Sequence, residues 1–115
     1  MKARILITLL VSLVCLCSHA DEYKIQQSRR YSQEAEYYLK KAENYYKEAD
    51  YYLKKAEGYQ REASYYTKKG DADRAKDYLR MADNAMNEYK TQIRYAENAQ
   101  NTAADYHRKA ANALR

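Results

Sequence analysis

Alanine and tyrosine alternate at steps of three and four residues through the first half of this chain. The two sets are Ala35, Ala42, Ala49, Ala56 and Ala63, and Tyr31, Tyr38, Tyr45, Tyr52, Tyr59 and Tyr66. This is the spacing of one seam on a supercoiled helix, with alanine at heptad position a and tyrosine at position d. Because the seven-residue period is strict, the pattern predicts a left-handed coiled coil and not an isolated straight helix.

A longer repeat of two heptads lies over this seam. Residues 37–43, YYLKKAE, return as residues 51–57 and again, in decayed form, as residues 65–71. The 115-residue chain also contains no proline and only two glycines, so it has few places at which to turn. These features exclude collagen-like, all-β and proline-rich disordered chains and indicate an all-α protein.

The second half of the chain carries its own seam in a shifted frame. One column is predicted at Leu79, Met86, Ile93, Gln100, His107 and Leu114, and the other at Ala75, Ala82, Tyr89, Ala96, Ala103 and Ala110. The frame changes by two residues at Gly70 and Asp71, where glycine can end one helix and aspartate can cap the next. We therefore expect a long antiparallel αα-hairpin made of a helix over 22–69, a turn at 70–71 and a helix over 72–114.

The sequence around this turn combines small side chains with a glycine-aspartate pair. Ala63 and Tyr66 precede the segment 69–75, KGDADRA, and Leu79 and Ala82 follow it. Residues 63–82 thereby resemble the junction between the two helices of a tetratricopeptide repeat. The resemblance implies close antiparallel packing at the corner. It does not imply a peptide-binding groove, because the chain lacks the 34-residue period and the terminal proline of that family.

Both predicted helices carry apolar side chains beside the seam. In the first helix these are Ile25, Leu39, Tyr46 and Leu53 at position e, with Tyr23, Tyr37, Tyr51 and Tyr65 at position c; in the second they are Tyr78, Ala85, Ala99, Tyr106 and Ala113. So wide an apolar arc favours burial against more than one neighbour. We predict a homodimer that forms a four-helix bundle. The alternative is that the flanking tyrosines are simply exposed.

The first twenty residues have the pattern of a secretory signal peptide. Lys2 and Arg4 precede the apolar segment 5–16, and residues 18–20 provide the small side chains that a signal peptidase recognises. Cleavage after Ala20 would leave residues 21–115 as the mature helical hairpin, without a transmembrane segment or a cysteine, and secreted or periplasmic. A lipid anchor on Cys17 is the alternative, although Leu16 is larger than the residue a lipobox places there.

Lysine pairs follow the tyrosines of each repeat and form the candidate surface site. Its residues are Tyr37, Lys40, Lys41, Tyr51, Lys54, Lys55, Tyr65, Lys68 and Lys69. Acid-before-base pairs at i, i+4 are also predicted, at Glu36 with Lys40, Glu43 with Lys47, Asp50 with Lys54 and Glu57 with Arg61. These pairs favour a solvated polar face. A ladder that binds anionic lipid or glycan is the alternative, and no nucleic-acid partner is expected in an exported protein.

Catalytic chemistry has little support in the sequence. The predicted mature chain holds one histidine, His107, and no cysteine. We therefore expect no metal site, no cofactor and no enzyme activity. The expected position of His107 in the seam suggests a polar spacer that sets register, or a group whose protonation loosens that end of the bundle.

Two functions of different class follow from these patterns. The first is an exported structural or interaction protein: a tyrosine-rich, self-associating helical rod that serves as a spacer or scaffold in a periplasm, envelope or extracellular layer and contacts itself or an envelope protein. The second is a surface-binding module that uses the tyrosines and lysines of the first helix for anionic lipid or glycan.

Overall fold

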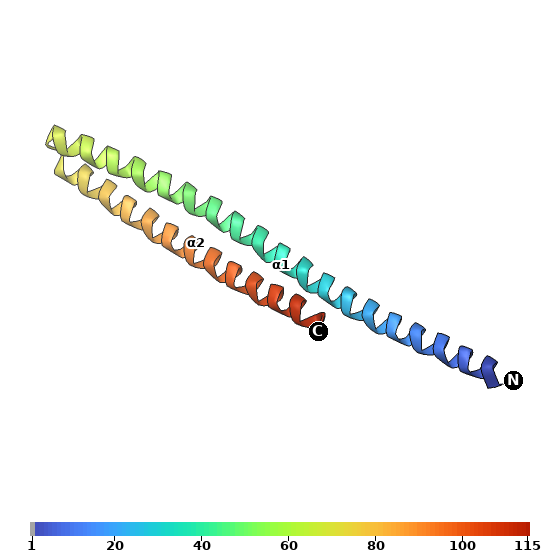
Figure 1. Ribbon diagram of the computed structural model, residues 1–115. Helices are drawn as coiled ribbons and strands as arrows, with labels where there is room; N and C mark the ends of the chain where they lie inside the picture. The colour runs from blue at the N-terminus through green and yellow to red at the C-terminus, as the bar shows by residue number, and fades with distance from the viewer. Residues whose placement is uncertain (1) are drawn as a thin grey trace. The chain divides into compact units, whose positions relative to one another are not determined.

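Two long helices joined by a tight turn make up the structure, a computed structural model that describes the backbone of residues 2–115 and the side chains of residues 20–115. Helix α1 spans Lys2–Lys69 and helix α2 spans Ala72–Ala113 (Figure 1). The described residues contain no strand. The predicted all-α helical hairpin is thus confirmed. Helix α1 includes residues 2–20 of the predicted signal segment, whereas residue 1 and the side chains of residues 1–19 lie outside the described set.

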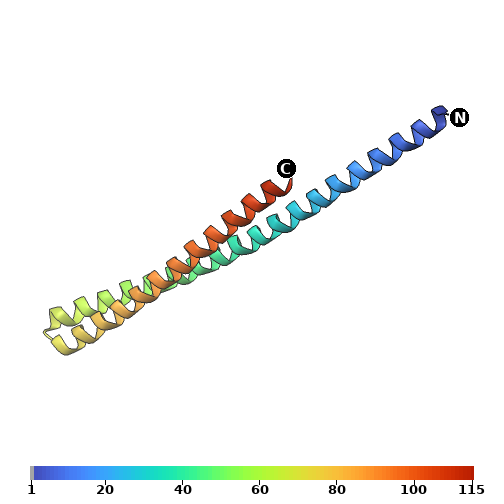
Figure 2. The same ribbon diagram turned by 90° about the horizontal axis from the view of Figure 1, so that it is seen from below.

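The chain divides into two compact units. Unit one contains residues 1–37 and 102–115, and unit two contains residues 38–101. Unit two holds the turn, and in both views its part of α2 runs back beside its part of α1 (Figures 1 and 2).

Alanines form the fully buried layer of unit two. They are Ala42, Ala49, Ala56 and Ala63 from α1 and Ala75, Ala82, Ala85, Ala96 and Ala99 from α2, each at most 7% exposed. Tyrosine rings contact one another across this layer: Tyr45 lies 5.5 Å from Tyr95, and Tyr78 lies 6.3 Å from Tyr59, measured between ring centroids. Since alanine lets two helix backbones approach closely, the half-buried rings can cover the seam from its edges.

Unit one repeats the same packing with other residues. Ala35, Ala103 and Ala110 are buried, and the rings of Tyr31 and Tyr106 lie 6.2 Å apart. Lys24 Nζ donates a hydrogen bond to the carbonyl oxygen of Arg115, at 3.4 Å. Within this unit, residues 24–35 of α1 and the C-terminal residues 103–115 are therefore paired in the antiparallel sense expected of a hairpin.

One column of the α2 seam differs from the prediction. The positions that accompany the buried alanines are Tyr78, Ala85, Gln92, Ala99, Tyr106 and Ala113, one residue before those predicted. Leu79 and Leu114 are 51% and 56% exposed. Gln100 and His107 are exposed as well, while Met86 and Ile93 are half-buried. The interpretation of His107 as a spacer inside the seam, or as a switch acting there, is therefore wrong.

The physical reason for this shift is the closeness of the two backbones. A seam that buries alanine in every heptad leaves little depth for a branched aliphatic side chain between the helices. A small side chain fits there, and a flat ring can lie along the partner helix. The larger aliphatic side chains are consequently displaced by one position, to the side of the seam.

The turn is built by Gly70 and Asp71. Gly70 has a φ of 81°, and its N–H bonds to the carbonyl of Thr67 at 3.1 Å. The N–H of Asp71 bonds to the carbonyl of Tyr66 at 2.9 Å, which completes a Schellman motif. The Asp71 carboxylate then accepts a bond from the N–H of Arg74 at 3.2 Å. Gly70 thus ends α1 in a left-handed conformation, and Asp71 caps α2.

Candidate functional site

The candidate site from the sequence lies on the outer side of α1. Tyr37, Tyr51 and Tyr65 occupy heptad position c, and their rings are 53%, 51% and 49% exposed. Lys40, Lys54 and Lys68 occupy position f, and Lys41, Lys55 and Lys69 occupy position g. Tyr37 belongs to unit one, and the other eight residues belong to unit two. We call these eight residues of unit two the tyrosine–lysine face.

Tyrosine and lysine pair within the face in two successive repeats. The ammonium of Lys55 lies 4.9 Å from the ring centroid of Tyr51, and that of Lys69 lies 4.6 Å from the ring centroid of Tyr65. Both are i, i+4 cation–π pairs on one side of the helix. In the first repeat, the ammonium of Lys41 lies 5.7 Å from the ring centroid of Tyr38.

The tyrosines of the face also touch the seam. Tyr51 packs edge to face on Tyr52 with centroids 5.3 Å apart, and Tyr65 packs in the same way on Tyr66 at 5.2 Å. Because Tyr52 and Tyr66 are half-buried seam residues, each exposed ring is held against the core by its sequence neighbour. These exposed rings are therefore partly fixed in orientation.

Carboxylates neutralise part of the lysine charge. Of the four predicted i, i+4 ion pairs, the structure forms those of Lys47 with Glu43 at 3.3 Å and of Lys54 with Asp50 at 2.9 Å. The side chains of both pairs are more than half exposed. Exposed pairs of this kind contribute little to stability, but they reduce the positive field that an anionic ligand would meet.

Two lysines of the face have raised pKa values. A hydrogen bond and the charge of Asp50 raise the pKa of Lys54 above its usual 10.5. A hydrogen bond to Tyr51 also raises the pKa of Lys55, and the negative charge of the ionised Tyr51 phenolate adds to this effect. Both ammonium groups are therefore fully charged at neutral pH, and each is already engaged by a neighbour on α1.

Gly70 and Asp71 take no part in the face. Both serve the turn, where Arg74 Nε also lies 3.5 Å from the Asp71 carboxylate. From the sequence, both residues were predicted to form the turn alone, and the structure places them there.

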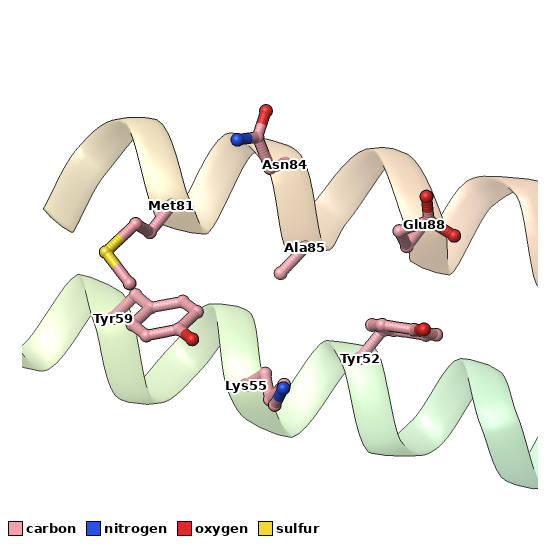
Figure 3. Close-up of a pocket in the computed structure, with 7 residues that line it drawn as sticks. All are labelled: Tyr52, Lys55, Tyr59, Met81, Asn84, Ala85 and Glu88. Atoms are coloured by element: carbon pink, nitrogen blue, oxygen red, sulfur yellow. The ribbon is translucent and has the colours of Figure 1, made fainter. Parts of the chain in front are cut away.

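A shallow open groove of about 200 Å³ lies along one edge of the seam in unit two. Tyr52, Lys55, Tyr59, Met81, Asn84, Ala85 and Glu88 line it. Figure 3 shows Met81 facing Tyr59 and Glu88 facing Tyr52 across the groove. This groove was not predicted from the sequence, although the g-position side chains of the two helices must meet along one edge of an antiparallel seam.

The opposite edge of the seam in unit two is mainly apolar: six of its nine e positions hold apolar side chains, and Gln60, Thr67 and Gln100 hold the other three. The apolar six are Leu39, Tyr46 and Leu53 from α1 and Leu79, Met86 and Ile93 from α2. We call these six residues the aliphatic face. The hydroxyl of Tyr46 donates to Oε1 of Gln100 at 3.1 Å, which ties the e positions of the two helices together. The α1 half of this face was predicted from the sequence, whereas the α2 half was predicted to lie in the seam.

Neither helix, within its described residues, contains a stretch apolar enough to cross a bilayer. The described residues also contain no group of three histidine, cysteine or acidic side chains placed to hold a metal ion. The side chains that are fully buried among the described residues are all alanines. The chemistry of this part of the chain is therefore carried on its outer faces.

Comparison of the chain with protein-family models, with curated proteins and with solved structures finds no match.

Proposed function

We propose that this protein is an exported structural or interaction protein, a self-associating helical hairpin that serves as a spacer or scaffold in a periplasm, envelope or extracellular layer. The observation that carries the proposal is the aliphatic face, which leaves Leu39 and Leu79 43% and 51% exposed in the single chain. An apolar surface built by both helices of a hairpin is typical of a protein that binds another protein.

Export is tested by expressing the full chain in a secreting host and determining the N-terminus of the exported form by mass spectrometry. A mature chain beginning at Asp21 supports a freely exported protein, and acylation of Cys17 supports an anchored one. Retention of the intact chain inside the cell would contradict the proposal.

The interaction role is tested by chemical cross-linking in the compartment that receives the protein, followed by mass spectrometry of the cross-linked species. Cross-links to further copies or to an envelope protein are expected, because the aliphatic face would then be covered. A chain that forms no cross-link at any expression level would contradict a scaffold role.

The second candidate function is binding of anionic lipid or glycan by the tyrosine–lysine face. The observation in its favour is the repetition of the cation–π pair, at Tyr51 with Lys55 and at Tyr65 with Lys69. We rank it below the first, since Lys54 and Lys55 already have intrahelical partners.

Vesicle binding separates the two candidates. A surface-binding module should bind anionic vesicles with an affinity that falls steeply with salt. Changing Lys40, Lys41, Lys54 and Lys55 together to glutamine should abolish that binding and leave the helix content intact. Changing Lys76, Arg80, Lys90 and Arg94 of α2 together to glutamine removes the same amount of positive charge and provides the matched control.

A further inference from the structure

We propose that the aliphatic face of unit two binds a second copy of this chain, with α1 of one copy packed against α2 of the other. This inference rests on the proposed function and names its partner and its geometry.

The exposed side chains of the aliphatic face are large and lie on both helices. Leu39 is 43% exposed, Tyr46 is 38% exposed and Leu79 is 51% exposed, while Leu53, Met86 and Ile93 are half-buried. The polar atom of the one tyrosine among them is already bonded, because its hydroxyl donates to Gln100. Covering the Tyr46 ring with apolar side chains therefore leaves no new unsatisfied donor.

The core of the hairpin favours a second layer. A pair of helices has one seam, and in unit two the fully buried side chains of that seam are all alanines. Large side chains stand at its edges, and the exposed ones among them, Leu39, Tyr46 and Leu79, keep 38% to 51% of their area in contact with water. Since a layer of helices is stable when its apolar side packs on another layer, a second hairpin supplies what the first one lacks.

The available area fits a weak dimer. Six aliphatic or aromatic side chains with this exposure present on the order of 400 Å² per copy, or about 800 Å² in total before the polar rim is added. With the rim, the total reaches the lower end of the range for specific interfaces. We therefore expect a dissociation constant of about micromolar.

Charges at the edges of the face select one arrangement. Position b borders the face on each helix, and on α1 these residues in unit two are Glu43, Asp50 and Glu57, followed by Ser64. On α2 the bordering residues are Lys76, Asp83, Lys90 and Glu97. All eight are exposed. If α1 packs on α1 of the second copy, the three acidic residues of one border meet the same three acidic residues of the other. If it packs on α2, that acidic border meets Lys76 and Lys90 as well as Asp83 and Glu97, so the repulsion is smaller and two oppositely charged partners lie within reach.

The same acidic border disfavours an anionic membrane as the occupant of this face. Insertion of Leu39 and Leu53 into such a surface would bring Glu43, Asp50 and Glu57 against lipid phosphates of the same sign. A lipid-bound state through this face is consequently an outcome that would contradict the proposal.

The first test measures the mass of the exported protein by sedimentation equilibrium from about 1 to about 500 µM. The exported protein should move from monomer to dimer across this range. Changing Leu39 and Leu79 together to glutamine should raise the dissociation constant at least tenfold with unchanged helix content, because both side chains are exposed in the single chain.

The matched control changes Met81 and Tyr23 to glutamine, since these side chains are 41% and 68% exposed and neither belongs to the aliphatic face. The control should dimerise as the unmodified protein does. A monomer at every concentration, or equal loss of dimer in both double variants, would overturn the proposal.

The second test determines the arrangement. Asp50→Lys should weaken the dimer several-fold if Asp50 faces Lys90 of the second copy, and adding Lys90→Glu should restore it. If Asp50→Lys alone tightens the dimer, α1 packs on α1 and the stated geometry is wrong. A strictly monomeric protein that still cross-links to an envelope protein would refute this inference and leave the proposed function standing.

Discussion

The rings of Tyr66 and Tyr78 lie parallel across the turn, with their centroids 5.6 Å apart and an angle of 6° between their planes. Tyr66 is the last seam tyrosine of α1, and Tyr78 is the first of α2. Tyr78 also contacts Tyr59, one heptad before Tyr66. One ring of α2 thus spans two successive tyrosines of α1, which fixes the register of the hairpin next to its turn.

We predict that Tyr78→Ala lowers the free energy of unfolding by about 2 kcal/mol, since it removes two ring contacts and half-buried apolar area. The measurement is urea unfolding followed by far-ultraviolet circular dichroism at one fixed protein concentration. Tyr23→Ala is the control and should change stability by less than about 0.5 kcal/mol, because that ring is 68% exposed. Equal losses in the two variants would show that the stacked ring is not a stabilising contact.

Glycine has opposite effects at the two positions where it occurs. Gly70 has a φ of 81°, which side chains other than glycine adopt at a cost, although no atom would contact an added methyl group. Gly58 lies inside α1, where an added Cβ would meet only Arg61 Nη2, at an ordinary 3.9 Å. Gly70→Ala should therefore destabilise by about 1 kcal/mol, and Gly58→Ala should stabilise by about 0.5 to 1 kcal/mol. Thermal unfolding of the two variants checks both signs, and a shift of both midpoints in one direction would contradict the assignment.

The sequence predicted the hairpin and the alanine columns because both depend on local rules. Two helices and the turn between them can be placed from the seven-residue period and from the glycine–aspartate pair at which the frame of that period changes. The position of Leu79 was misjudged for a different reason. Hydropathy favours leucine over tyrosine in a core, whereas the depth of this seam is set by how close Ala75 and Ala82 allow the two backbones to come.

The missing information was nevertheless present in the first helix. There, Tyr38 stands at position d and Leu39 follows it at position e, and the pair Tyr78 and Leu79 repeats that order after the turn. Applying one heptad layout to both helices would have placed Leu79 outside the seam. The groove beside Met81, by contrast, depends on which g positions face each other, and that register follows from the turn geometry and not from composition.

Enlarging a seam alanine should damage the hairpin. Ala82 is 2% exposed, so Ala82→Leu forces the two backbones apart or the side chain into a strained rotamer, and we expect a loss of about 1 to 3 kcal/mol. Ala104→Leu is the matched control, because Ala104 is exposed on the same helix and leucine is nearly as good a helix former as alanine. Chemical unfolding of both variants is the measurement. If Ala82→Leu proves as stable as the control, the close approach of the helices does not depend on small side chains.

The two raised lysine pKa values predict separable titrations on neighbouring residues. Lys54 owes its raised pKa to Asp50, and Lys55 owes its own to Tyr51. Carbon-detected NMR of the lysine Cε atoms should show both groups titrating above 10.5. Asp50→Asn should return Lys54 towards 10.5 and leave Lys55 raised, while Tyr51→Phe should do the reverse. A parallel shift of both lysines in either variant would contradict these assignments.

The sign of the associated stability change follows from the same shifts. Each pKa is higher in the folded chain than its usual value of 10.5, so the folded state holds the proton more tightly. The small stabilisation is then complete below pH 10.5 and is lost as the pH rises through the raised value. Unfolding measured at neutral pH and above pH 10.5 should therefore show a difference between the unmodified protein and Asp50→Asn that shrinks at the higher pH. A difference that grows with pH would mean that Asp50 acts on some group other than the Lys54 ammonium.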